Sequence, residues 1–316
     1  MKQRVVYITL GIVALIVIGL AVYYSIDWEK YVKINESNFP DPVFREEVES
    51  FDKNNDGKLS EKERLDVKYI RVNDSSIKSL QGIAYFKNLT DLDCKNCYLK
   101  ELDVSENTEL HNLDCSENRL IELDLAENNE LVSLDCSENS IDELILPNNS
   151  SKLSRVSCNG NYIERLSVGK YSNLSSLDCS DNELTKLDVS KNTELTHFSC
   201  DYNQLTSIDV SKCTELYLLS CAGNQITYLD VTKCPELAML TCSDNQLTGL
   251  DLRKNPDLYT LACMNNKIGE LDIRNCKVRY ALSLGEGYVN NGIRAYTTTT
   301  MPPFIIICDE ETEVNY

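Results

Sequence analysis

The chain has 316 residues, which is long enough for two ordinary domains or one elongated repeat array. Aspartate and glutamate total 50 against 31 lysines and arginines, so the net charge is −19. Nucleic acids and anionic membrane surfaces are poor partners for such a chain, because both are bound by basic patches. With only two histidines in the sequence, there is little material for histidine-based catalysis.

The first predicted element is a membrane segment. An apolar run at 5–24 follows Lys2 and Arg4, and twenty helical residues rise about 30 Å, the thickness of a bilayer core. We interpret residues 1–27 as a transmembrane signal anchor, with the N-terminus in the cytoplasm and the rest of the chain outside. A cleaved signal peptide, with cleavage near 19–21, is the alternative and would give a secreted protein.

Residues 28–66 are predicted to form a small helical cap around the run DKNNDGKLSEKE. Counted from Asp52, oxygen-bearing residues occupy loop positions one, three, five, nine and twelve, and Gly57 occupies position six. Ca²⁺ requires oxygen ligands, and glycine permits the sharp turn after the third one. The run resembles an EF-hand calcium loop. The resemblance implies one structural Ca²⁺ held by Asp52, Asn54, Asp56, the carbonyl of Lys58, Ser60 and Glu63.

The flanks of this loop predict two short helices. Asp41-Pro42 is typical of a helix start, and Ser60 with Glu63 forms a capping box for the second helix. Arg64 departs from the EF-hand pattern, which usually has an apolar residue there. Because the loop has no partner loop, we expect calcium to lock the cap rather than to open a groove. An acidic loop that caps the helices without metal is the alternative.

Residues 67–281 repeat the pattern Leu-x-x-Leu-x-Cys-x-x-Asn-x-Leu in nine units, at steps of 21 residues with one step of 22. The nine cysteines that mark the units are Cys94, Cys115, Cys136, Cys158, Cys179, Cys200, Cys221, Cys242 and Cys263. The pattern resembles the leucine-rich repeat, and the whole chain is similar to internalin-like bacterial surface proteins. The resemblance implies a leucine-rich repeat solenoid of the α/β class that is mostly β here, with a parallel β-sheet on its concave face and extended segments on the opposite side.

These cysteines occupy the position of an inward-facing leucine. A cysteine thiol behaves as a small, strongly buried apolar group, which is what this position needs. A ladder of disulfides between coils is the alternative, but the Cβ atoms of neighbouring parallel strands point the same way, which fits the disulfide dihedral angle badly. We therefore predict buried thiols.

A second period is nested in the first. The pattern Leu-Asp-Val-Ser-x-Asn follows each cysteine by about ten residues, with asparagines at Asn107, Asn128, Asn149, Asn192 and Asn255 and cysteines at Cys213, Cys234 and Cys276. The aspartates of this pattern, from Asp103 to Asp272, form a column of like charges on neighbouring coils. We expect their carboxylates to accept hydrogen bonds within each turn; bridging cations are the alternative. Residues 282–316 are predicted to form a C-terminal β cap, with strands at 295–300 and 304–308.

The outward-facing residues of the strands carry the functional prediction. Toward the N-terminal end they are acidic, with Asp91, Asp114 and Asp135 among them. Toward the C-terminal end they are aromatic and apolar, a composition enriched at interfaces. The predicted partner-binding residues are Tyr202, Tyr217, Leu218, Met239, Tyr259 and Met264. Scattered apolar surface residues without a role are the alternative.

Nothing in the chain assembles a nucleophile, a base and an orienting group, so an enzyme is not expected. The leading hypothesis is an exported, membrane-tethered recognition module that binds a protein or another cell-surface macromolecule through its concave face and acts as a monomer. A structural spacer of the cell envelope without a specific ligand is the alternative.

Overall fold

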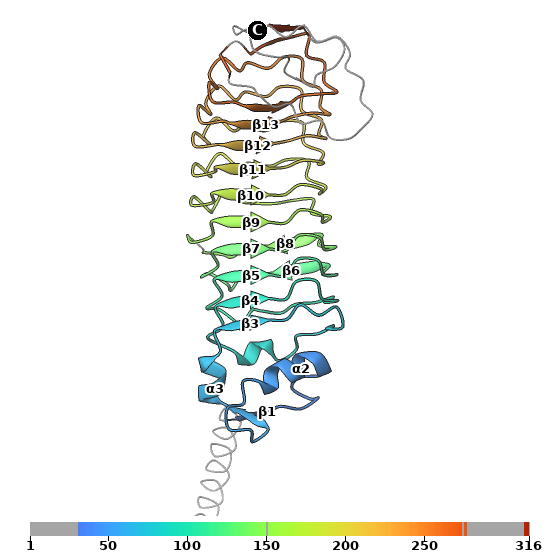
Figure 1. Cartoon of the computed structure of the whole chain (residues 1–316), viewed down its shortest axis with the longest axis vertical. Coiled ribbons are helices and arrows are strands. Elements are labelled where there is room, and N and C mark those ends of the chain that lie inside the picture. The colour runs from blue at the N-terminus through green and yellow to red at the C-terminus, as the bar shows by residue number, and fades with distance from the viewer. Residues whose placement is uncertain (1–30, 150, 274, 277–312, 316) are drawn as a thin grey trace, which may run out of the picture.

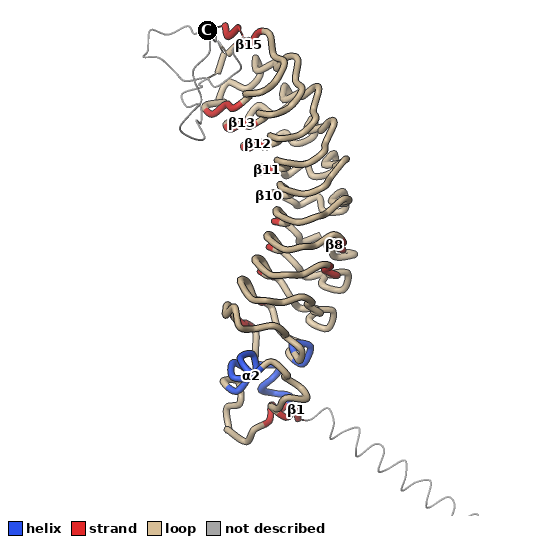
Figure 2. The backbone as a smooth tube through the Cα atoms, turned by 90° about the vertical axis from the view of Figure 1, so that its right-hand side faces the viewer, coloured by secondary structure: helices blue, strands red, loops and turns tan. Residues whose placement is uncertain are grey.

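The computed structural model describes residues 31–149, 151–273, 275–276 and 313–315. Within these ranges, the repeats stack as coils along one long axis above a small helical cap (Figure 1). One strand from each coil joins a parallel sheet of ten strands. In sheet order they are β3 (Tyr69–Arg71), β4 (Asp91–Asp93), β5 (Asn112–Asp114), β7 (Ser133–Asp135), β9 (Arg155–Ser157), β10 (Ser176–Asp178), β11 (His197–Ser199), β12 (Leu218–Ser220), β13 (Met239–Thr241) and β14 (Thr260–Ala262). This sheet lies on the inner side of the curved solenoid (Figure 2).

The repeat period sets the register of the sheet. Leu113 of β5 pairs with Leu134 of β7, and across the 22-residue step Leu134 still pairs with Val156 of β9. The additional residue is therefore accommodated outside the sheet. Because alternate residues of a strand face the same side, the middle residue of each strand and the cysteine after it point into the solenoid.

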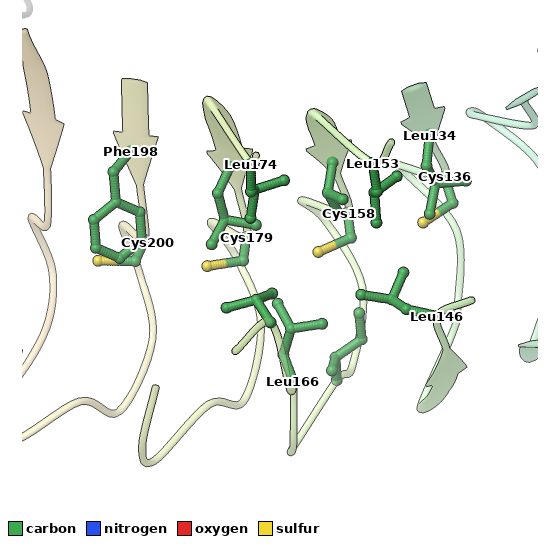
Figure 3. Close-up of a cluster of buried hydrophobic side chains, with 14 of the residues drawn as sticks. Leu134, Cys136, Leu146, Leu153, Cys158, Leu166, Leu174, Cys179, Phe198 and Cys200 are labelled. Atoms are coloured by element: carbon green, nitrogen blue, oxygen red, sulfur yellow. The ribbon is translucent and has the colours of Figure 1, made fainter. Parts of the chain in front are cut away.

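The interior is one continuous apolar cluster that runs from the cap to the last described coil. Figure 3 shows Cys136, Cys158, Cys179 and Cys200 stacked beside apolar side chains of the same coils, leucines in the first three and Phe198 in the last. All thirteen cysteines of the described residues are thiols without a disulfide bond, and all but Cys276 are buried. This confirms the predicted buried thiols, and burial raises the pKa of ladder thiols such as Cys179 well above the ordinary value.

A ladder of asparagines, here called the front ladder, turns the chain after each strand of the sheet. Asn182 shows the pattern: its Nδ2 donates to the carbonyls of Cys158 at 2.9 Å, Cys179 at 3.2 Å and Ser180 at 3.0 Å. Its Oδ1 accepts from the backbone N–H of Ile163 at 2.9 Å. The same acceptor bond from the preceding coil is made by Asn118, Asn139, Asn161, Asn203, Asn224, Asn245 and Asn266. Each amide thereby satisfies backbone groups of two coils.

The second asparagine column, the back ladder, closes the other end of each coil. Asn192 donates to the carbonyls of Val168 at 2.9 Å and Tyr171 at 2.8 Å, but its Oδ1 has no hydrogen-bond partner. The same holds for the Oδ1 atoms of Asn107, Asn128 and Asn255. The thiols of Cys213, Cys234 and Cys276 point at carbonyls in the same way, at 3.6–3.9 Å.

One coil does not follow the back ladder that the sequence predicts. Asn149, expected on the ladder, is exposed, and its N–H donates to Asn129 Oδ1 at 2.8 Å. The 22-residue step falls in this part of the chain, so a fixed count of 21 residues does not reach the ladder position there. In the next coil the position is taken by Tyr171, whose buried phenol donates to the carbonyl of Pro147 at 2.8 Å.

The back of the solenoid is less regular than the nested period predicts. Among the described residues, strands occur there only as β6 (Glu122–Asp124), which pairs with β8 (Glu143–Ile145), and β15 (Glu270–Asp272), which pairs with β16 (Glu313–Asn315). The aspartate column is held by hydrogen bonds within the turns, as predicted. Asp188 Oδ1, for example, accepts from Ser190 N–H at 2.9 Å. These bonds lower the pKa of Asp188.

The cap contains β1 (Tyr31–Lys33), α2 (Pro42–Glu49), β2 (Lys58–Ser60), α3 (Glu61–Asp66) and, below the first coils, the 3₁₀ helix η1 (Ile83–Tyr85). Asp41 is the N-cap of α2, as predicted, and its Oδ1 accepts from Val43 and Phe44 N–H. Its Oδ2 accepts from Lys78 N–H at 2.8 Å. In the first coil Cys97 occupies the front-ladder position and offers no amide oxygen, so the cap supplies the missing acceptor.

Two predictions lie outside the described residues: the N-terminal anchor at 1–27 and the strands at 295–300 and 304–308. Among the residues that the structure does describe, no helix has the length and apolar character needed to cross a membrane.

Candidate binding surface

Residues at the start of β11–β13 and directly before β12 and β14 form one surface on the inner face of the curve. We call His197, Tyr217, Leu218, Met239 and Tyr259 the aromatic strip. Tyr217 and Tyr259 lie two coils apart, and their hydroxyls are hydrogen-bonded at 3.0 Å. Ala238, in the coil between them, is only 3% exposed. The two phenols therefore meet through their hydroxyls across the coil that carries this small residue.

The other members extend this surface along the sheet. The His197 ring lies 5.9 Å from the Tyr217 ring, centroid to centroid, at a tilt of 39°. Leu218 pairs with Met239 in neighbouring strands, and both are half-buried. Tyr217 remains 40% exposed although its hydroxyl is paired. The pKa of Tyr259 is raised, first by the hydrogen bond to Tyr217 and then by burial.

Four of the six predicted partner-binding residues lie together in the strip. The other two do not: Tyr202 and Met264 follow the C-terminal ends of β11 and β14, where the chain has already left the sheet. The strands are only three residues long, and for this reason these two side chains lie on a separate rim. Sequence reasoning missed His197, which shares its strand position with Leu218 and could have been found from that column.

The rim has an unusual backbone. The same position of each coil has a positive φ angle, held by Asn96, Glu117, Glu138, Gly160, Asp181, Tyr202, Gly223, Asp244 and Asn265. Tyr202 is the only aromatic residue among them, with φ 49°, and bulky residues are disfavoured in this conformation. A Cβ atom at Gly223 would lie 2.4 Å from Tyr202 Cδ1. Glycine in the next coil therefore makes room for the Tyr202 ring, which is 57% exposed.

The N-terminal part of the same face is acidic, as predicted, but its charges are engaged internally. Asp93 Oδ2 pairs with Arg71 Nε at 2.7 Å, and Asp91 accepts from Asn112 Nδ2 at 2.6 Å. Asp114 accepts from the hydroxyl and N–H of the residue two positions ahead, as does the aspartate of β7. These contacts shape turns, and only Asp93 among these carboxylates is paired with a cation. The C-terminal half is the better candidate surface because it carries the aromatic strip.

The predicted calcium loop lies in the cap, at the opposite end of the solenoid from the strip. Asp52 and Glu63 are 8% and 9% exposed. Asp52 Oδ2 accepts from Gly57 N–H at 2.8 Å, and Glu63 accepts from Lys53 N–H and Ser60 N–H, each at 2.8 Å. Hydrogen bonds from Ser60 are the largest cause of a lowered pKa at Glu63.

The residues of this loop fit Ca²⁺ in donor type and in order. The loop contains two nearly buried carboxylates and further oxygen donors, and it turns at Gly57, whose φ angle is 77°. In the described residues, however, no three Asp, Glu, His or Cys side chains are gathered around one point. The loop is also braced in a way the sequence did not predict. Val32 of β1 pairs with Leu59 of β2, so a strand from before the first helix replaces a partner loop.

The chain is similar to solved structures of other proteins. No protein-family model and no curated protein matches the chain. The functional domain of InlJ from Listeria monocytogenes, described as including a cysteine ladder, is 27% identical over 80% of this chain and 70% of that chain, with a TM-score of 0.47. The internalin InlF from Listeria monocytogenes is 19% identical over 79% of this chain and 97% of that chain, with a TM-score of 0.52. The plant peptide hormone receptor RGFR1, solved in complex with RGF2, is 20% identical over 70% of this chain and 45% of that chain, with a TM-score of 0.57.

The fold is a leucine-rich repeat solenoid. The parallel sheet, the repeated inward leucines and the two structural matches with TM-scores of 0.52 and 0.57 agree on this. The sequence prediction of the fold class is confirmed.

Proposed function

We propose that this chain is an exported, membrane-tethered recognition module that binds a protein through the concave face of its solenoid. The observation that carries the proposal is the aromatic strip over β11–β14. Tyrosine and methionine are enriched at protein interfaces, and large side chains surrounded by small polar ones are typical binding anchors. Ser199, Ser220 and Thr241 supply such small neighbours in the strip's own strands.

A structural spacer would need only the stacked interior. An exposed cluster of phenols and a thioether contributes nothing to stacking and carries a risk of aggregation, so its presence favours a binder. The same fold holds RGF2 in the complex of the plant receptor RGFR1. The tether is supported by the apolar run at 5–24 with its two preceding basic residues.

Calcium belongs to this proposal as a lock on the cap. When bound, the ion would supply positive charge between the nearly buried carboxylates of Asp52 and Glu63. The loop would then hold α2 and α3 together, and the cap protects the first coil from fraying, as array ends require.

The proposal is tested by comparing the proteins that the parent chain captures with those that a variant of the aromatic strip captures. The full-length chain, purified in a mild detergent and immobilised, is exposed to surface extracts of candidate partner cells, and retained proteins are identified by mass spectrometry. We expect at least one protein to be retained by the parent chain and lost by the Tyr217→Ala/Tyr259→Ala variant.

The matched control replaces two tyrosines that are more exposed than Tyr217 and Tyr259 but lie off the strip. Tyr162 and Tyr228 are 56% and 70% exposed, and their double alanine variant should retain the same protein. Identical capture by all three chains would contradict the strip as the binding surface.

A further inference from the structure

The outward positions of the last five described coils carry negative charge and no positive charge. From β10 to β14, neither the strand residues that face outward nor the turn after each strand contains a lysine or an arginine. The same positions contain four aspartates, here called the acidic rim: Asp178, Asp181, Asp201 and Asp244. The aromatic strip lies near the start of these strands, and the rim lies at or just past their ends.

The carboxylates of the rim accept hydrogen bonds from neutral groups. Asp201 accepts from Ser220 Oγ at 2.6 Å and Ala222 N–H at 2.5 Å, and Asp244 accepts from an amide at 2.6 Å. The ion pairs found between described residues lie elsewhere in the molecule. The rim therefore presents negative charge that the solenoid does not neutralise by direct pairing.

Tyr202 places an aromatic face within this rim. It directly follows Asp201, and it lies one coil from Asp181, which holds the same position in the preceding coil. Its strained backbone and the space left by Gly223 keep the ring exposed beside these carboxylates. An aromatic face within about 6 Å of a lysine or arginine side chain attracts the cation, and a nearby carboxylate adds to that attraction.

Asp201 has a further reason to favour a cation. Its pKa is raised, chiefly by burial and also by the charges of Asp178 and Asp181. A positive group from a partner would offset both effects, since an opposite charge favours the ionised carboxylate.

Building on the proposed function, we propose that the bound partner is a polypeptide segment that places an apolar anchor on the aromatic strip and lysine or arginine side chains on the acidic rim around Tyr202. The two subsites lie toward opposite ends of three-residue strands, which span about 10 Å. A segment that crosses the sheet roughly along its strands therefore meets the apolar subsite first and the cationic one after it.

The test uses three labelled synthetic peptides of about 12 residues, long enough to span both subsites. One carries tryptophan and leucine at one end and lysines at the other. The second replaces the lysines by glutamates, and the third keeps the lysines but replaces the apolar residues by serines. Binding to the full-length protein is measured by fluorescence anisotropy at low and at moderate salt. We expect the first peptide to bind at least about tenfold more tightly than either of the others, with an advantage that shrinks as salt screens the charges.

Two variants separate this rim from the general negative charge of the chain. Asp181→Asn/Asp201→Asn should weaken the first peptide about fivefold to tenfold at low salt, because charged contacts are lost while the amide still accepts hydrogen bonds. Glu122→Gln/Glu143→Gln removes the same net charge from exposed positions of the back strands β6 and β8 and should leave binding unchanged. Thermal melting of both variants checks that the fold is intact.

The outcomes distinguish the two proposals. Equal binding of the lysine and glutamate peptides, or equal weakening by both charge variants, would overturn the basic segment while leaving the strip as the contact site. Peptide binding that is insensitive to Tyr217→Ala/Tyr259→Ala would count against the strip itself. Displacement of a retained partner by neutral polysaccharide, with none of the three peptides bound, would also overturn the inference in favour of a glycan.

Discussion

The inner and outer residues of the same strands follow different rules. Inward, the coils repeat almost without change, and Leu219 and Leu240 of neighbouring strands pair in register at 0% exposure. Outward, the same strands change from aspartates near the cap to tyrosines and methionine near β13. The repeated residues therefore specify the solenoid, and the residues that differ from coil to coil indicate where it binds.

The two asparagine ladders extend this comparison to the turns. A front-ladder amide donates to carbonyls and accepts from the preceding coil, whereas a back-ladder amide only donates. A thiol or a phenol can replace a donor, and the back ladder accordingly contains Cys213, Cys234 and Tyr171. The one front-ladder cysteine, Cys97, stands where Asp41 supplies the acceptor.

The largest expected effect comes from ionising the interior thiols. Burial raises the folded-state pKa of these thiols, so their contribution to stability is complete below the unfolded pKa and is lost as pH rises above it. The pKa is raised by burial at seven ladder thiols, and each contributes about 1.4 kcal/mol per pH unit. We expect the free energy of unfolding to fall by on the order of 10 kcal/mol per unit above about pH 9.

Urea unfolding followed by circular dichroism in the presence of reductant measures this dependence. A midpoint that stays constant from about pH 8 to about pH 10 would contradict buried thiols. Alkylation provides a second check, since the thiols should react only after denaturation and without any need for reductant.

Adjacent leucines test the inward and outward assignment directly. Leu219 is 0% exposed, and Leu219→Ala should reduce the free energy of unfolding by about 3 kcal/mol through lost burial and a cavity. Leu218 is its half-buried outward neighbour, and Leu218→Ala should lower the free energy of unfolding by less than about 1 kcal/mol. A reversed order in urea unfolding would mean that the strand register is wrong by one residue.

Substitutions in the two asparagine ladders should lower the free energy of unfolding by smaller amounts, and the loss should differ between the two ladders. Asn182→Cys leaves Ile163 N–H without an acceptor and should cost about 2–3 kcal/mol. Asn192→Cys removes an oxygen that has no partner and should cost about 1 kcal/mol or less. Equal losses in urea unfolding would remove the distinction between the ladders.

Calcium should have the smallest effect on stability. At a concentration about tenfold above its dissociation constant, one bound ion stabilises the folded state by about 1.4 kcal/mol. The melting temperature should therefore rise with calcium and fall again with a chelator. Glu63→Gln should abolish the rise, and equal melting of the parent chain with calcium and with chelator would contradict a stabilising metal.

The periodic part of the structure could be predicted from the sequence because each inward residue meets the same environment in every coil. The count alone failed at Asn149, where the 22-residue step shifts the ladder to other residues. It also placed Tyr202 and Met264 with the strip, because a column in the sequence does not show where a three-residue strand ends. The strand that braces the calcium loop, β1, has no periodic signal and became visible only through its pairing with β2.

The most direct test of the account measures folding and binding on one variant. Tyr217→Ala/Tyr259→Ala changes two outward residues of the aromatic strip and no inward one. We predict a urea unfolding free energy within about 1 kcal/mol of the parent chain and binding to the captured partner weakened by about 2 kcal/mol, or roughly thirtyfold, because central interface anchors carry most of the binding energy. Unchanged stability together with unchanged affinity would contradict the claim that the strip is the recognition surface.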